Sequence, residues 1–364
     1  MTDSLMRLQA VLQRKQQDAL LVTNPENRYY LSGYSAHDTS PAESAGALLI
    51  PARGRPFLLT DFRFQLQAEA EAASFRVVLY RRGLLALLKR MLPGLGIKKL
   101  VFESHAMLYG TGRQLCEILQ KLAIEPIPVT GLVEKLRIRK SAGELEKIRQ
   151  AVLLNEAVFQ EIYAELAPGQ TERQVANKIE ATMRAKGAEG PSFATIVASG
   201  PNGAQPHAVP GHRLIRPGEP VVIDMGVRLH GYCSDMTRTV VLGRPDDRTV
   251  ELIRLVRRAQ LTGLAAIRAG VTSRAVDKAA REVITRAGYA KYFGHGLGHG
   301  VGLAVHEAPA LNRRCRKKLQ VGMVVTVEPG IYLPGWGGVR LENMVIVTES
   351  GPEIINKDST FLDI

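Results

Sequence analysis

Cysteine is scarce in this chain of 364 residues, whose three cysteines are Cys116, Cys233 and Cys315. They lie far apart, are odd in number and form no CxxC pair, so neither a disulfide framework nor a cysteine-ligated zinc site is expected. No run of about 18 apolar residues occurs, which argues against a membrane-spanning helix. The first turns of the chain also lack the apolar core of a signal peptide. We therefore expect a soluble protein of the reducing cytoplasm.

Aromatic residues are sparse too, at 5%, whereas basic residues outnumber acidic ones and give a net charge of +13. Such a charge can indicate binding to nucleic acid or to another anionic partner. The densest basic cluster, residues 313–318, has no interleaved aromatic residues and no recognisable nucleic-acid motif. We interpret it as a solvated basic surface and expect no nucleic-acid partner.

The pattern of apolar residues changes near residues 130–140. Before this point, short apolar runs alternate with helical stretches, which predicts an α/β domain with a mixed sheet over residues 1–133. That half contains no cluster of metal-ligand residues. After it, Ser141 and Glu144 form a capping box that begins a long helix. We expect a second domain over residues 134–364, and it contains the candidate functional residues.

Two aspartates, Asp224 and Asp235, lie in what we predict to be two strands joined by a tight turn. If the turn is at residues 229–230, the two aspartates face each other directly. If it is at residues 230–231, Asp224 faces Thr237 and Asp235 is its diagonal neighbour. In both registers the carboxylates share one sheet face, roughly 5–8 Å apart. Two like charges this close repel and are costly to desolvate, so we expect a cation between them.

Three more candidate ligands, His299, Glu328 and Glu342, lie on strands or Gly-rich segments of the same half. One histidine plus four carboxylates suits Mn²⁺, Co²⁺, Fe²⁺ or Zn²⁺. Five ligands, some of them bridging, fit two ions about 3.5–4 Å apart, and a water between such ions becomes a nucleophilic hydroxide. Each residue taken alone also fits a simpler role. A strand aspartate beside Arg238 can be an ion pair, and a histidine among glycines can be a turn residue.

Five short motifs resemble the pita-bread metallopeptidases: VVIDMG, GYCSDMTRTV, GHGVGLAVHE, VEPGIY and VRLENMV. The intervals of 11 (235−224), 29 (328−299) and 14 (342−328) between the candidate ligands also match. The family comprises methionine aminopeptidases, prolidases (Xaa-Pro dipeptidases), Xaa-Pro aminopeptidases and the metal-free creatinases. The resemblance implies an α+β pita-bread catalytic domain from about residue 135. It also implies a creatinase-like N-terminal domain, which methionine aminopeptidases lack.

The resemblance further implies a role for each ligand. Asp224 is expected to chelate the second ion, Asp235 and Glu342 to bridge both ions, and His299 and Glu328 to hold the first. Glu328 is also expected to accept a proton from the attacking water. The implied cofactors are two divalent metal ions, manganese or cobalt in preference, with zinc or iron also compatible.

Other residues match groups around the metal site of the family. His207 and His306 match histidines that contact the substrate, the latter at the scissile peptide and its tetrahedral intermediate. Arg340 and Tyr332 match groups that orient Asp224 and the ligand cluster. His295 is expected in the wall of the site. Relatives often have an acidic residue at the position of residue 304, which is an alanine here.

An Xaa-Pro bond lacks the N–H that ordinary proteases bind, so its cleavage requires strong activation of water and an apolar slot for the ring. The two-domain layout favours this reaction, at the N-terminus of short peptides or in dipeptides, over methionine release. Dipeptidase and aminopeptidase remain open alternatives. A non-catalytic RNA- or ribosome-binding relative, a methionine aminopeptidase and a creatinase-like enzyme are the others. The resemblance also implies a homodimer, in which the loop of residues 33–40, with His37 and Asp38, is a candidate wall of the partner's site.

Overall fold

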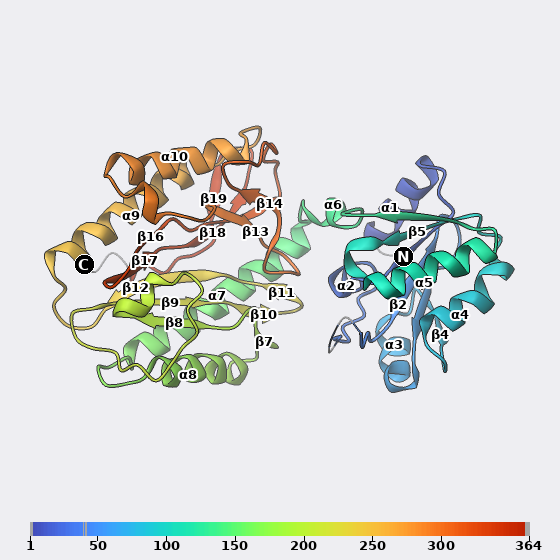
Figure 1. The fold of residues 1–364 in the computed structure, drawn as a ribbon, viewed down its shortest axis with the longest axis horizontal. Coiled ribbons are helices and arrows are strands. Elements are labelled where there is room, and N and C mark those ends of the chain that lie inside the picture. Colours follow the sequence, from blue (N-terminus) through green and yellow to red (C-terminus); the bar gives the residue numbers. More distant parts are fainter. Residues whose placement is uncertain (1–2, 39, 41, 361–364) are drawn as a thin grey trace. The chain divides into compact units, whose positions relative to one another are not determined.

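The computed structural model describes residues 3–38, 40 and 42–360, and the chain divides into two compact units, Met1–Arg137 and Ile138–Ile364 (Figure 1). The division lies four residues (137−133) after the boundary predicted from the sequence, which remains a prediction. Residue 39, in the loop that we considered as a wall of a partner's site, lies outside the described residues. Each unit is described below by itself.

Unit 1 is built on one mixed sheet with the strand order β4-β3-β2-β1-β5-β6. Pairs β1–β2 and β2–β3 are antiparallel, whereas β1–β5, β3–β4 and β5–β6 are parallel. The mixed sheet predicted for this half is therefore confirmed, including the Pro-containing β6 at its edge, where a missing N–H leaves no gap in a ladder. The strands are β1 (Ala19–Val22), β2 (Ala47–Pro51), β3 (Phe57–Thr60), β4 (Arg76–Leu79), β5 (Lys99–Glu103) and β6 (Glu125–Val129).

Helices cover both faces of this sheet, which explains why its strands read as continuous apolar runs rather than alternating ones. Along β1, Leu20 packs into one apolar core and Leu21 into the other, because successive side chains point to opposite faces. The helices are α1 (Asp3–Arg14), α2 (Pro25–Ser32), α3 (Gln65–Glu71), α4 (Leu84–Met91), α5 (Tyr109–Lys121) and α6 (Glu134–Arg137), with short 3₁₀ turns η1 (Phe62–Phe64), η2 (Leu92–Leu95) and η3 (Ser104–Ala106).

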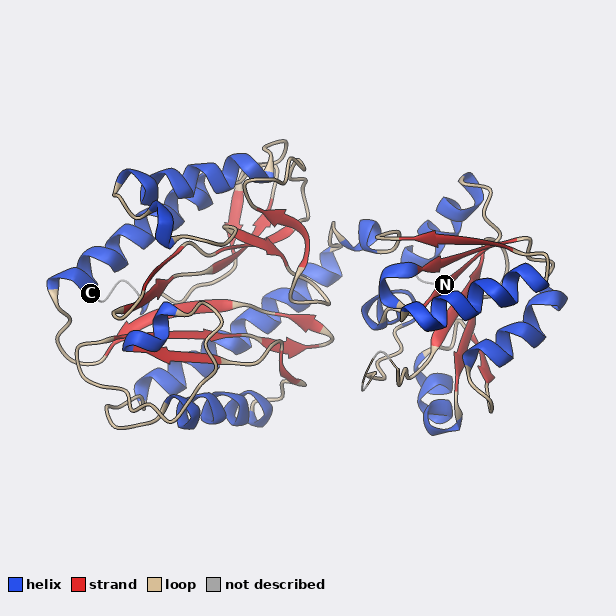
Figure 2. Ribbon diagram, viewed as in Figure 1, coloured by secondary structure: helices blue, strands red, loops and turns tan. Residues whose placement is uncertain are grey.

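Unit 2 places its strands between two pairs of helices (Figure 2). Helix α7 begins with the predicted capping box of Ser141 and Glu144, and α8 begins with a second box formed by Thr171 and Gln174. One apolar core lies between α7, α8 and β8–β12, and another lies between α9, α10 and β13–β18. The helices are α7 (Ala142–Ala164), α8 (Glu172–Ala185), α9 (Asp247–Ala265) and α10 (Ser273–Arg286), with 3₁₀ turns η4 (Gly200–Ala204) and η5 (Ala290–Tyr292).

The strands of unit 2 form several small sheets, with orders β11-β10-β7, β12-β9-β8, β14-β13-β15-β18-β19 and β16-β17. Their bounds are β7 (Gly190–Pro191), β8 (Ile196–Ser199), β9 (Pro220–Met225), β10 (Val227–Leu229), β11 (Tyr232–Cys233), β12 (Met236–Val241), β13 (Gly298–Gly300), β14 (Glu307–Leu311), β15 (Val324–Val327), β16 (Gly330–Leu333), β17 (Gly337–Arg340), β18 (Asn343–Val347) and β19 (Pro352–Ile354).

The hairpin of the two aspartates adopts the second of the two registers considered above. Asp224 on β9 pairs with Thr237 on β12. The turn residues His230 and Gly231 have φ values of 52° and 77°, as a type I′ turn requires. The same register brings Gly226 close to the backbone at Ser234, where an added Cβ would lie 2.1 Å from the carbonyl oxygen. The ladder is interrupted there, and Asp235 lies just before β12.

The continuous strand predicted over residues 339–347 is wrong in one respect. The chain leaves β17 after Arg340 and joins β18 at Asn343, so that Glu342 belongs to neither strand. The backbone N–H of Glu342 instead donates to the carbonyl of Thr237, at 3.1 Å. This crossover moves the chain from pairing with β16 to pairing with β15, and it places the Glu342 carboxylate beside β12.

Candidate metal centre

A cavity of about 510 Å³ in unit 2 brings the predicted site residues together. Its polar lining includes all nine side chains that the sequence indicates as ligands, substrate contacts or orienting groups: His207, Asp224, Asp235, His299, His306, Glu328, Tyr332, Arg340 and Glu342. His295 lies in the same wall. The lining thus draws on segments more than 130 residues apart (342−207).

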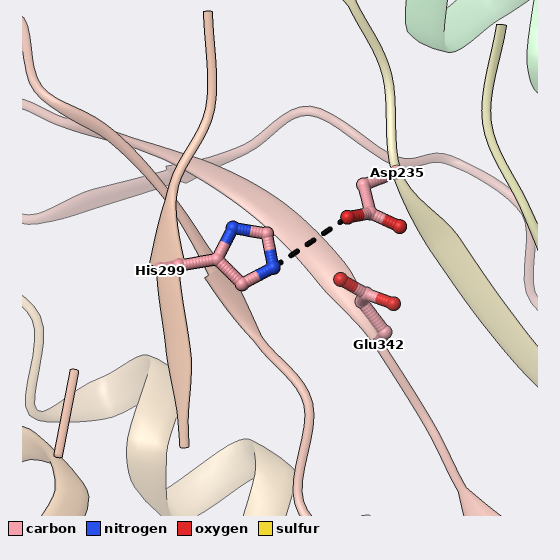
Figure 3. A group of neighbouring side chains, drawn as sticks. All are labelled: Asp235, His299 and Glu342. Atoms are coloured by element: carbon pink, nitrogen blue, oxygen red, sulfur yellow. Dashed lines mark ion pairs between the residues drawn. The ribbon is translucent and has the colours of Figure 1, made fainter. Parts of the chain in front are cut away.

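Asp235, His299 and Glu342 form the tightest group in this cavity. One ligand atom from each side chain lies within 4.8 Å of the others, and the three side chains point toward one another (Figure 3). The His299 Nε2 atom lies 3.6 Å from Asp235 Oδ2 and 3.2 Å from Glu328 Oε1. Four of the five predicted ligands therefore surround the tip of one imidazole.

Two buried carboxylate oxygens at the centre have no hydrogen-bond partner among the described residues: Asp224 Oδ1 and Glu342 Oε1. Unpartnered buried oxygens of this kind are costly unless a cation or water meets them. Carboxylate oxygens and an imidazole nitrogen are the donors that divalent ions such as Mn²⁺, Co²⁺ or Zn²⁺ accept. The residues present therefore fit a divalent metal site.

Burial sets the electrostatics of the carboxylates. Desolvation, reinforced by the neighbouring carboxylates, raises the pKa of both Asp235 and Glu342 well above the usual range. Desolvation also raises the pKa of Asp224, against the opposing effect of Arg340. These three groups lack sufficient positive charge within the protein, because each is harder to ionise than in water. A divalent cation supplies the missing charge.

Glu328 and His299 differ, because they form an ion pair. Burial opposes ionisation of Glu328, but the hydrogen bond and charge of His299 outweigh it and lower the pKa of Glu328. Burial likewise lowers the pKa of His299, whereas Glu328 and Glu342 raise it to about 9. In the metal-free protein His299 is thus protonated at neutral pH, and a metal must displace that proton.

Arg340 connects several parts of the site. Its Nη2 donates to Asp224 Oδ2 at 2.7 Å, and its Nε donates to Thr237 Oγ1 at 3.0 Å. Its Nη1 donates to the Tyr332 hydroxyl at 3.0 Å and to the Pro206 carbonyl at 3.2 Å. The guanidinium therefore fixes one oxygen of Asp224 and leaves the other directed to the cavity.

His295 and Tyr332 extend this network along the wall. The His295 Nε2 atom lies 2.9 Å from the Tyr332 hydroxyl. Burial lowers the pKa of His295 and raises that of Tyr332. Both groups are therefore neutral near pH 7 and act through hydrogen bonds.

The two histidines expected to contact substrate lie on different sides of the cluster. The His306 ring meets the His299 ring edge-on, with centroids 4.3 Å apart. Burial and the neighbouring His299 lower the pKa of His306, which keeps its imidazole neutral at pH 7. His207 is exposed at the tip of the loop that follows η4. The carbonyl of Pro206 beside it accepts a hydrogen bond from Arg340.

Glu172, which begins helix α8, holds the loop of His207 from below. Its fully buried carboxylate accepts hydrogen bonds from the Ser199 N–H at 2.8 Å, the Asn202 amide at 3.1 Å and the Gly211 N–H at 3.2 Å. These donors lie on both sides of His207 in the sequence. One carboxylate thus closes the loop on itself.

Sequence reasoning missed two threonines of the site. The Thr237 hydroxyl donates to Glu342 Oε2 at 2.8 Å, and the Thr326 hydroxyl donates to Glu328 Oε1 at 3.1 Å. Thr237 lies two residues after Asp235, and Thr326 lies two residues before Glu328. In an extended chain such pairs share one face, so this spacing is the signal that could have identified both threonines.

The apolar part of the lining was also missed. It consists of small and apolar residues from the start of β8 and from the loop after η4: Phe193, Ala194, Ile196, Pro206, Ala208, Val209 and Pro210. We expected a single strand over residues 193–198, whereas β8 begins only at Ile196. The irregular chain before it is what turns Phe193 and Ala194 to the cavity.

The simpler roles considered for individual residues are resolved in part. Arg238 pairs with Asp358, at 2.6 Å, rather than with either aspartate of the hairpin. The charged residues of the basic cluster at 313–318 are exposed. The three cysteines are free thiols. Within the part of the chain that the structure describes, no helix is both long and apolar enough to span a bilayer.

Comparison with known proteins agrees with this geometry. Over 338 residues, 93% of each chain, the sequence is 39% identical to the uncharacterized peptidase YqhT of Bacillus subtilis. A solved Xaa-Pro dipeptidase from Bacillus anthracis superposes with a TM-score of 0.91, with 40% identity and 98% of each chain covered. An X-Pro aminopeptidase from Thermotoga maritima gives 0.87 and 36% identity, covering 97% of this chain and 98% of that one.

Family-level comparison covers both units. Residues 5–139 match the creatinase/prolidase N-terminal domain, and residues 146–349 match metallopeptidase family M24. The divalent-metal site derived above is what membership of this family implies. The chain therefore belongs to metallopeptidase family M24 and carries its catalytic unit behind a creatinase/prolidase-type N-terminal domain.

Proposed function

We propose that this protein is a metal-dependent exopeptidase that hydrolyses the Xaa-Pro bond at the N-terminus of short peptides or in dipeptides. The observation that carries the proposal is the cluster of one histidine and four carboxylates around a cavity, with two carboxylate oxygens unpartnered. The names of similar structures, one an Xaa-Pro dipeptidase and one an X-Pro aminopeptidase, support the substrate class.

Five side chains would hold two divalent ions. We assign Asp224 to one ion and His299 with Glu328 to the other, with Asp235 and Glu342 shared between them. When bound, the ions neutralise the buried carboxylates and activate water for attack at near-neutral pH. Manganese and cobalt are our preferred ions, and the same oxygen-rich donor set also suits iron and zinc.

The remaining polar groups act on the substrate or on the ligands. Glu328 accepts the proton of the attacking water, and the Thr326 hydroxyl at 3.1 Å fixes the orientation of its carboxylate. The neutral imidazole of His306 donates a hydrogen bond to the oxygen of the scissile peptide as charge develops there. His207 contacts the substrate from the opposite loop. Arg340 and Tyr332 keep Asp224 and the wall in place.

The apolar lining supports a preference for proline. A pyrrolidine ring has no N–H to donate, so the residue that carries it gains most from an apolar surface without unsatisfied acceptors. Phe193, Ile196 and Pro210 supply such a surface beside the metal cluster. Methionine release, the runner-up activity, is not favoured by any specific feature of this lining.

We further propose that the enzyme is a cytoplasmic homodimer with domains at residues 1–133 and 134–364. The free thiols support a reducing compartment. In the loop of residues 33–38, His37 is exposed, whereas Asp38 is held by the buried Arg28 at 2.9 Å. A loop fixed in this way can present His37 to a second subunit.

Hydrolysis assays with the metal-stripped and reloaded protein test the function. We expect Mn²⁺ or Co²⁺ to restore turnover of Ala-Pro, Ala-Pro-Ala or both, and the ratio between them distinguishes a dipeptidase from an aminopeptidase. Absence of turnover on both peptides at saturating metal would contradict the proposal. Cleavage of Met-Ala-Ser alone would favour methionine release. A salt-dependent shift with RNA and no bound metal would favour the non-catalytic alternative.

A further inference from the structure

Arg238 on β12 is a fully buried arginine that touches the metal-bearing segments without contacting the cavity. Its Nη1 donates to the carbonyl oxygens of Thr237, at 3.0 Å, and of Glu342, at 2.6 Å. Its Nε donates to Asp358 Oδ2 at 2.6 Å, and its Nη2 to the Asp358 carbonyl at 3.3 Å. One guanidinium therefore joins two site residues to a segment near the end of the chain.

Asp358 is itself held in place by helix α7. Glu156 Oε1 accepts hydrogen bonds from the backbone N–H groups of Lys357, at 2.7 Å, and Asp358, at 2.9 Å. Gln160 and Thr360 donate to Asp358 Oδ1. The side chain of Asp358 is 1% exposed. The carboxylate that neutralises Arg238 is thus fixed by several independent contacts.

The two carbonyls that Arg238 binds belong to the residues that orient the Glu342 carboxylate. Glu342 lies in the crossover between β17 and β18, so no strand pairing fixes its carbonyl. Its N–H donates to the Thr237 carbonyl and its Oε2 accepts from the Thr237 hydroxyl. Arg238 supplies the donor that secures both backbones from the side opposite the cavity.

Stability alone does not explain a buried ion pair at this position. Replacing such a pair by apolar residues of similar volume is often neutral or stabilising, because desolvating two charges offsets their attraction. Positioning is a better explanation, because a guanidinium presents several donors in a fixed plane. An apolar side chain at position 238 cannot hold the Thr237 and Glu342 carbonyls.

We propose that Arg238 is a positioning residue for Glu342, and that Asp358 completes the metal centre by holding Arg238 in place. The segment of residues 356–360 then belongs to the metal site functionally, although it contributes no ligand. This inference rests on the proposed role of Glu342 as a metal ligand. Disturbing the pair should weaken metal binding in protein that is still folded.

Titration of Co²⁺ into the metal-stripped full-length chain, followed by calorimetry, tests the inference together with thermal unfolding of the same samples. Two variants are informative: D358N, and the double variant R238M/D358L. We expect both to bind Co²⁺ about 10–100-fold more weakly than the wild type, as for other residues that orient metal ligands. The double variant should retain cooperative unfolding because it buries no unpaired charge.

Glu353→Gln provides a matched control. It weakens the Arg149–Glu353 pair, which joins α7 to β19 at 2.8 Å but is partly exposed and contacts no metal-bearing residue. We expect wild-type affinity for Co²⁺ in this variant. Wild-type affinity in folded R238M/D358L, or in D358N if the double variant does not fold, would overturn the inference. Failure of the wild type itself to bind Co²⁺ would instead overturn the proposed function.

Discussion

At the scale of the residue, Asp235 and Glu342 are two buried acids that the fold keeps close without enough positive charge. Burial and mutual repulsion raise the pKa of each well above its usual value. Their folded-state pKa values therefore exceed the unfolded ones, so in metal-free protein their contribution to stability is full below about pH 4. It is lost as the pH rises through the folded-state values. A bound divalent cation removes this penalty.

Asp235→Asn separates the two effects. In metal-free protein at pH 7 the amide replaces a group that is unfavourable as a buried anion, so we expect a Tm equal to or above that of the wild type. The wild type should gain about 2.7 kcal/mol when Mn²⁺ is present at 100 times its Kd, whereas the variant should gain little and have no peptidase activity. Thermal unfolding with and without Mn²⁺ measures both. A metal-dependent shift of wild-type size in the variant would exclude Asp235 as a ligand.

Metal affinity should depend on pH through His299. Its pKa of about 9 means that the imidazole carries a proton at pH 7, and only the neutral ring binds a metal. Binding therefore releases protons, and affinity should rise with pH up to about 9. Calorimetric titrations at pH 7 in two buffers with different ionisation heats count the released protons. Metal binding with no net proton release would contradict this account.

The sequence predicts the charged residues of the site better than the residues that orient them. Carboxylates and histidines at set intervals are rare enough to stand out, so Asp224, Asp235, His299, Glu328 and Glu342 could be identified as candidates. Thr237 and Thr326 could not, because a threonine in a strand is ordinary. Their importance depends on which atoms meet across β12 and β15, which only the folded chain determines.

At the scale of the element, the loop that carries His207 depends on the single carboxylate of Glu172. That group accepts hydrogen bonds from Ser199, Asn202 and Gly211, and it is fully buried. Losing a buried acceptor costs about 1–3 kcal/mol. The loop contains no predicted ligand, so its mobility should affect substrate binding and leave the metal in place.

Glu172→Gln should therefore lower kcat/KM about tenfold, mostly through KM, while Co²⁺ affinity stays unchanged. The amide turns a donor toward donors of the loop and frees the His207 tip. Steady-state kinetics on Ala-Pro-Ala, paired with Co²⁺ titration, separates the two quantities. Glu180→Gln, the same substitution later in the same helix, serves as the control. Loss of metal affinity in Glu172→Gln would indicate that the loop is part of the metal site.

Elements were predictable where the local signal was strong. The capping boxes at Ser141 and Thr171 mark where α7 and α8 begin. The turn at His230-Gly231 has residues that tolerate positive φ, and it decided between two registers that residue patterns alone left open. The break at Glu342 was not predictable, because it comes from a hydrogen bond to Thr237, about a hundred residues earlier in the chain.

At the scale of the whole molecule, every proposed ligand lies between residues 224 and 342, within unit 2. Metal binding should therefore slow amide hydrogen exchange in β9, β12, β15 and β18 and leave β1, β2 and β5 of unit 1 unchanged. Exchange measured by mass spectrometry on metal-free and Mn²⁺-loaded protein tests this. Equal protection of the unit 1 strands would mean that the metal is bound elsewhere or acts on the whole chain.

The motifs that the sequence offers lie in the second half, and unit 1 has no comparable chemical pattern. Its fold could still be predicted, because apolar runs separated by helical stretches indicate a mixed sheet covered on both faces. Its contribution to function could not, because it depends on what His37 and the loop around it meet. The sequence therefore predicts chemistry for one unit and architecture for both.

The most direct test of the central claim is a titration of Mn²⁺ into the metal-stripped chain while hydrolysis of Ala-Pro and Ala-Pro-Ala is recorded. We predict that activity is absent without metal and rises until about two equivalents per chain are bound, with no rise in Asp235→Asn. Hydrolysis of these peptides by the fully stripped chain, or none at saturating Mn²⁺ and Co²⁺, would contradict the account.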